Sequence, residues 1–172
     1  MSKLIARSRP EQIVQQAQYY VKSYILLPSG ILGLICMVGG VGGLGYQLLA
    51  TDNYTWDTFS QSTGLIVLGV AMGLVQTRYH QFVLAQFPDV LAARMRMATA
   101  KKGSAAKKDT DIPAIEHQGR QLIPVAYVVG TVLILGASWG AAMLGQVDAA
   151  PALLLPWAGF YWARLFFWRG RV

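Results

Sequence analysis

The chain has 172 residues, of which 54% are hydrophobic and 13% are charged, and its formal net charge is +7. A soluble domain has about 25% charged residues, so this composition predicts an integral membrane protein with too little remaining chain for a separate soluble domain. Nucleic acid is not needed as a partner to explain the basic excess, because the placement of the basic residues along the chain explains it.

All fifteen lysines and arginines fall in three parts of the chain: before the first apolar segment, between the second and third, and at the end of the fourth. The other two connections, at 51–60 and 146–148, carry only acidic charges, namely Asp52, Asp57 and Asp148. Lysine and arginine are enriched in cytoplasmic loops of membrane proteins. The pattern predicts four spans with both termini in the cytoplasm, in a bacterial inner membrane or an equivalent energy-transducing membrane.

Residues 9–23 place apolar side chains at helical spacing, with glutamines on the opposite face. The apolar set comprises Ile13, Val14, Ala17, Tyr20 and Val21. This pattern predicts an amphipathic helix that lies along the cytoplasmic membrane surface. A helix that docks on a partner subunit would have the same pattern, so both interpretations stay open.

The first two spans are predicted over 24–49 and 59–78. No charge occurs from Ile25 to Ala50, which is ample for a hydrocarbon core of ~30 Å. The helix of the second span is expected to continue to about residue 87, because Pro88 disfavours helical geometry directly before it. A basic cytoplasmic segment follows over 89–120, with a short surface helix at its start and a flexible lysine-rich linker at 101–112.

The last two spans are predicted over 121–145 and 149–168, and their short connection makes them an antiparallel hairpin. Arg164 falls within the fourth span, where a long side chain can reach the headgroups. The fold class is therefore an all-α integral membrane four-helix bundle, formed as a single membrane domain over 1–172.

Small residues recur at GxxxG spacing in three of the predicted spans. These pairs are Gly39 and Gly43, Gly69 and Gly73, and Gly136 and Gly140. In lipid no hydrophobic force drives helices together, and small residues allow close backbone packing, so we predict helix-packing interfaces at all six. Gly40 and Gly42 add small residues on a second face of the first span. This surface could pack within the four-helix bundle, or it could meet another protein or a flat ligand such as a pigment or quinone. Gly145 is expected to extend the stripe of the third span.

His80 is the candidate cofactor ligand, at the cytoplasmic edge of the second span. Histidine ligates haem iron, and it can also bind the metal of a pigment. The one other histidine, His117, lies in the cytoplasmic segment, so the sequence gives little support for a haem held by two histidines. A histidine that forms hydrogen bonds at the interface is the alternative.

No acidic residue lies within any predicted span. Proton pumps, most coupled transporters and carboxylate proteases need ionisable groups there, so these classes are disfavoured. The sequence predicts a non-enzymatic small subunit, or an assembly or scaffold factor, of a larger membrane complex. Its expected partners are other integral membrane subunits and anionic lipid headgroups on the cytoplasmic side, without nucleic acid, and no cofactor is required. The alternatives are a pigment-, haem- or quinone-associated subunit of an electron-transfer or light-harvesting complex, and a small channel or exporter.

Overall fold

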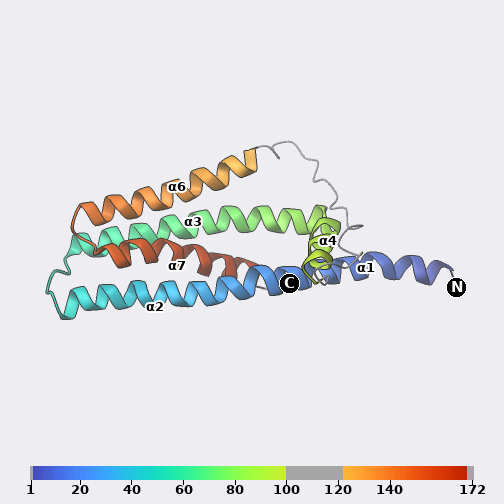
Figure 1. The fold of residues 1–172 in the computed structure, drawn as a ribbon, viewed down its shortest axis with the longest axis horizontal. Helices are drawn as coiled ribbons and strands as arrows, with labels where there is room; N and C mark the ends of the chain where they lie inside the picture. Colours follow the sequence, from blue (N-terminus) through green and yellow to red (C-terminus); the bar gives the residue numbers. More distant parts are fainter. Residues whose placement is uncertain (1, 100–121, 170–172) are drawn as a thin grey trace.

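The computed structural model describes residues 2–99 and 122–169, with side chains described from residue 11 onward. Every element in these ranges is a helix, which confirms the prediction of an all-helical chain (Figure 1). In chain order the elements are α1 (Ser2–Tyr20), the π-helical η1 (Val21–Leu26), α2 (Leu27–Leu49), α3 (Trp56–Gln86), α4 (Pro88–Thr99), α6 (Leu122–Met143) and α7 (Ala149–Trp168). The predicted linker at 101–112 lies outside the described residues.

Three helical stretches are long and apolar enough to cross a membrane: Glu11–Leu49, Trp56–Gln86 and Leu122–Met143. A helix is suited to the hydrocarbon interior because its backbone hydrogen bonds are satisfied within the segment. These three stretches are compatible with a multi-pass membrane protein. The helix α7 is not among them, because its tryptophans, tyrosine, prolines and Arg164 lower its mean hydropathy.

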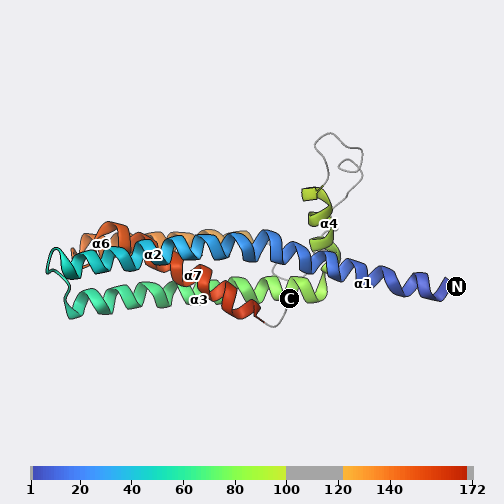
Figure 2. The ribbon, with the colours of Figure 1, turned by 90° about the horizontal axis from the view of Figure 1, so that it is seen from below.

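The first helix continues into the first apolar span, where the sequence predicted a separate helix over 9–23 along the membrane surface. Figures 1 and 2 show α1 extending the line of α2 beyond the other helices. The π-helical segment joins them: Leu27 N–H donates to the Lys22 carbonyl, five residues back, directly before Pro28. Proline has no N–H to donate, so the change of hydrogen-bond register before it preserves the helix without a turn.

The helix α7 lies in the middle of the molecule, along α2 and α3 and, less extensively, along α6 (Figures 1 and 2). Several of its small and branched residues are fully enclosed, among them Ala152, Leu155 and Ala158, each at most 1% exposed. A helix whose sides face protein needs less hydrophobicity than one that faces lipid. This position explains why α7 is less apolar than α2 and α6.

Polar contacts join the two short connections at one end of the molecule. Buried Gln47 donates from Nε2 to the Gln146 carbonyl at 3.4 Å, and its Oε1 accepts from Asp148 N–H at 3.3 Å. The Thr58 hydroxyl also donates to the Gln146 carbonyl, at 2.9 Å. The helix α6 ends at Met143, because Gly145 adopts a φ of 70° in the turn. The expectation that Gly145 extends the helical stripe of the third span is therefore wrong.

An apolar cluster joins the helices at the opposite end. Its buried members are Ala17, Val21, Ile25, Val83, Leu91 and Trp168. They come from α1, η1, α3, α4 and α7, so the short helix α4 is held against the long first helix. Arg96 of α4 also donates from Nε to Gln16 Oε1 of α1 at 3.1 Å. One apolar face of α1 is therefore covered within the chain itself.

Candidate functional site

Several glycines of α2 face the central helix α7. A Cβ added to Gly39 would lie 2.7 Å from Leu154 Cδ1, and one added to Gly40 would lie 2.8 Å from Leu155 Cδ2. Gly43 faces α7 as well, with Pro151 Cδ 3.0 Å from the added atom. Of the two glycines predicted on a second face, Gly40 is therefore covered by α7, whereas a Cβ on Gly42 would meet no described residue within 4 Å.

The glycines of α3 bring its backbone into contact with the backbone of α7. A Cβ on Gly69 would overlap the Pro156 carbonyl oxygen, and one on Gly73 would lie 2.5 Å from the Phe160 carbonyl oxygen. Gly159 of α7 approaches α3 in the same way, because an added Cβ would overlap the Ile66 carbonyl. Only glycine permits such an approach, so these residues set the distance between α3 and α7.

The glycines of α6 make no such contact. A Cβ added to Gly136 or Gly140 would meet no neighbouring described residue within 4 Å. The span Leu122–Met143 is also the least enclosed of the three. In its most apolar stretch 11% of the residues are buried, against 22% and 28% in the other two spans. The structure therefore brings four of the six predicted packing glycines against α7 and leaves the α6 pair on an open face.

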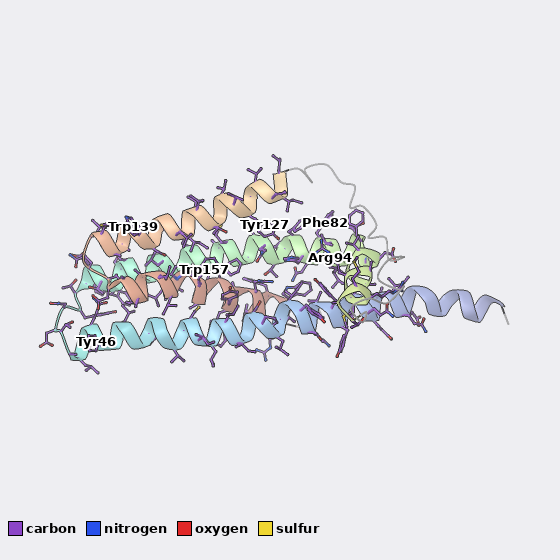
Figure 3. All side chains as sticks on the ribbon, in the orientation of Figure 1. Tyr46, Phe82, Arg94, Tyr127, Trp139 and Trp157 are labelled. Atoms are coloured by element: carbon purple, nitrogen blue, oxygen red, sulfur yellow. The ribbon has the colours of Figure 1, made fainter. Side chains whose placement is uncertain are left out.

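A cavity of about 450 Å³ lies between α3, α6 and α7. Its residues come from one stretch of each helix: Met72, Val75, Gln76 and Tyr79 of α3; Ile123, Ala126, Tyr127, Gly130, Thr131 and Ile134 of α6; Trp157, Phe160 and Arg164 of α7. Figure 3 labels Tyr127 and Trp157, which lie on its α6 and α7 sides. Most of the lining is apolar or aromatic, as in sites that bind small amphiphilic molecules.

The polar atoms of the cavity are incompletely paired. Among the described residues, the buried Nε of Arg164 and the buried Oε1 of Gln76 have no hydrogen-bond partner. The Arg164 guanidinium lies over the Phe160 ring, with Cζ 5.6 Å from the ring centroid. No carboxylate is among the described residues that line the cavity. The Arg164 guanidinium has no counterion in the described lining, and Gln76 Oε1 can accept a hydrogen bond. The cavity is therefore suited to an anion that also carries a hydrogen-bond donor.

His80 lies one turn beyond Gln76 on α3, outside the cavity lining. The Gln76 backbone carbonyl, one turn back, is a hydrogen-bond partner of its buried ring, and the ring centroid is 6.0 Å from that of Tyr79. Within the described ranges, no three His, Cys, Asp or Glu side chains gather closely enough to hold a metal ion. His117, the other histidine of the chain, lies outside those ranges.

Sequence reasoning missed the cavity because its parts are far apart in the chain. The sequence places Arg164 within the fourth span and predicts that its side chain extends outward to the headgroups. The structure instead buries its Nε beside residues of α3 and α6. The sequence signal that could have indicated a polar site between helices is Arg164 in one span together with Gln76 in another.

The chain matches no protein-family model, no curated protein and no solved structure. The class of protein is therefore defined by the fold alone: an all-helical chain with three helices long and apolar enough to cross a membrane.

Proposed function

We propose that this chain is a non-enzymatic integral membrane subunit, or an assembly or scaffold factor, of a larger membrane complex. The observation that supports it best is the open glycine face of α6, formed by Gly136 and Gly140. Glycine in a helix interior costs up to about 1 kcal/mol relative to alanine. Within the described chain, neither residue gains a close contact in return. A partner helix that packs on this face would supply that contact.

The proposal includes four crossings with both termini in the cytoplasm. The twenty residues of α7 rise about 30 Å, the thickness of a hydrocarbon core. Its packing along α2 and α3 supports a path across the membrane beside them. Asp52, Asp57 and Asp148 lie in or beside the connections at one end of these helices. The described arginines Arg78, Arg94 and Arg96 lie toward the other end, in α3 and α4, which supports this topology under the positive-inside rule. A bacterial inner membrane or an equivalent energy-transducing membrane fits this arrangement.

The expected partners are integral membrane subunits, with anionic headgroups near the basic segments and no nucleic acid. A non-enzymatic role fits spans that contain no acidic residue for proton or hydrolytic chemistry. Two lysine- and arginine-rich segments on one side of a bilayer attract anionic lipid by about 1 kcal/mol per basic residue near the surface. That attraction accounts for the net charge without another polyanion.

The test is to solubilise the tagged full chain from its native membrane in mild detergent and to measure the mass and composition of the particle. The informative variant is Gly136→Leu, whose site has no described neighbour within 4 Å. Its control is Val67→Leu of α3, an exposed position that already carries a large side chain. We expect stoichiometric partners with the wild type and the control, and loss of partners with Gly136→Leu.

Two outcomes would overturn the proposal. A wild-type particle that contains this chain alone, as monomer or homo-oligomer, would refute a subunit role and favour a channel or exporter. Partners retained equally by Gly136→Leu would refute the assignment of α6 as the docking helix.

A further inference from the structure

We propose that the cavity between α3, α6 and α7 binds one anionic phospholipid, with its phosphate at Arg164 and an acyl chain along the apolar wall. This inference does not need a partner subunit, because it concerns the inner side of α6 rather than the open face at Gly136. It rests on the proposed function only for the topology, which assigns Arg164 to the cytoplasmic leaflet.

Charge is the first argument for an anionic ligand. Arg164 is partly buried, its Nε is unpaired, and the described cavity lining holds no carboxylate. Charged groups at membrane depth are costly unless they are paired. A phosphate supplies several acceptor oxygens for a guanidinium, and such charge-assisted hydrogen bonds are about twice as strong as neutral ones. The phosphate of a lipid would therefore satisfy Arg164.

The second argument is the unpaired acceptor beside that charge. The Gln76 amide hydrogen-bonds Tyr127 on the opposite wall of the cavity, and its buried Oε1 has no described partner. A buried acceptor left unsatisfied costs about 1–3 kcal/mol, so a ligand that donates a hydrogen bond there is favoured. A glycerol headgroup has hydroxyl donors next to its phosphate. Phosphatidylglycerol thus matches both Arg164 and Gln76.

The shape and opening of the cavity supply the third argument. Its α6 wall runs from Ile123 to Ile134, a rise of about 16 Å, and is mostly apolar. Val75 and Thr131 line the cavity and are also exposed, at the outer surface of α3 and α6. An acyl chain could therefore enter sideways from the bilayer. A free phosphate would leave these apolar walls uncovered.

The position of Arg164 along the helices agrees with a lipid headgroup. It lies one turn before the end of α7, toward the end of the molecule that also holds Arg78 of α3 and Arg94 of α4. Under the topology proposed above, this is the cytoplasmic leaflet, whose anionic lipids attract basic residues. Trp157 and Ile134 lie farther along the helices, where an acyl chain would lie.

The experiment measures binding of short-chain phosphatidylglycerol to the purified full chain in detergent. Phosphatidylcholine with the same acyl chains and inorganic phosphate are the comparison ligands. We expect one phosphatidylglycerol per chain and a preference over phosphatidylcholine of at least about fivefold, from one basic contact. Arg164→Gln should abolish this preference, whereas Arg169→Gln, an exposed arginine five residues later, should retain it.

A second variant tests the walls without changing charge. A Cβ on Gly130 would already lie 3.4 Å from Met72 Sδ, so Gly130→Leu should fill the cavity and weaken binding of both lipids. Its control is Gly64→Leu of α3, which has no described neighbour within 4 Å and should bind like the wild type. The thiol reactivity of Cys36 in each variant reports whether the chain is folded.

Equal binding of the two lipids by the wild type would indicate a neutral amphiphile and overturn the proposal. A preference retained by Arg164→Gln would overturn it as well. Inorganic phosphate that binds as tightly as phosphatidylglycerol would show a site for the anion alone and refute the acyl-chain contact. Partner loss in Gly136→Leu is measured separately, so the two proposals can fail independently.

Discussion

At Gly69 the backbones of α3 and α7 touch, and adding a single methyl group there should push the two helices apart. The Cβ of Gly69→Ala would overlap the carbonyl oxygen of Pro156 and lie 3.0 Å from the Phe160 nitrogen. These neighbours are backbone atoms, so no side-chain rotation can relieve the overlap. α7 would have to move as a whole, away from its contacts with α2 as well.

The expected cost follows from this geometry. Extra methyl groups in a packed core cost about 1–3 kcal/mol, and a rigid backbone neighbour places Gly69→Ala toward the upper end. Alanine recovers up to about 1 kcal/mol because it favours the helix more than glycine does. We therefore expect a net loss of about 2 kcal/mol in the free energy of unfolding. This corresponds to roughly a 30-fold change in the ratio of unfolded to folded protein.

The single cysteine allows a direct assay. Cys36 is partly buried on α2, which packs along α7. Its rate of modification by a thiol reagent, measured at increasing SDS mole fraction in mild detergent, reports separation of these helices. Gly136→Ala is the matched control, because its Cβ meets no described neighbour within 4 Å. The control should unfold at the same SDS fraction as the wild type, or at a slightly higher one.

Equal stability of Gly69→Ala and Gly136→Ala would refute this reasoning. It would mean that α3 and α7 lie farther apart than the structure places them, or that α7 moves at little cost. A loss in Gly136→Ala as large as that in Gly69→Ala would also contradict it, because nothing in the described chain opposes that methyl group.

Two further predictions concern the ends of the molecule. Thr58→Val keeps the side-chain shape but removes the hydroxyl that bonds the Gln146 carbonyl, so stability in the SDS titration should fall by about 1–3 kcal/mol, whereas exposed Thr63→Val should change little. Equal losses of stability in Thr58→Val and Thr63→Val would refute a stabilising hydrogen bond between the Thr58 hydroxyl and the Gln146 carbonyl. Leu91 of α4 is 2% exposed in the wild type. Leu91→Ala should weaken the packing of α4 against its neighbours by about 2–5 kcal/mol and make α4 sensitive to limited proteolysis. Leu49→Ala, 84% exposed, should leave proteolysis unchanged, and protection of α4 in Leu91→Ala would contradict its docking on α1.

Local patterns in the sequence were sufficient to predict the helical class and where most of the long helices run. Apolar runs, Pro88 and the short connection before residue 149 act through neighbouring residues, so they need no knowledge of the fold. The same patterns predicted a separate helix over 9–23, whereas η1 joins α1 to α2 in one continuous helical stretch. The residues around Pro28 permit either a turn or a π-helical register change, and the sequence alone does not distinguish them.

The use of each glycine was decided only by the tertiary structure. Gly69 and Gly136 belong to identical GxxxG motifs, yet one lies against a backbone and the other has no described neighbour within 4 Å. Small residues serve internal and external packing equally well in lipid, so spacing cannot separate these roles. Gly69 and Gly136 differ because α7 lies in the centre of the molecule and so determines which face of each other helix is covered.

The sequence by itself determined that this chain is helical, apolar and divided by charge into two ends. Hydrophobicity and charge belong to individual residues and their near neighbours, so they can be read directly. Only the tertiary structure decided that Arg164, Gln76 and Tyr127 share one cavity. These residues come from three helices, and the physical reason they meet is how closely glycine lets α3 and α7 approach while α6 packs against them less extensively.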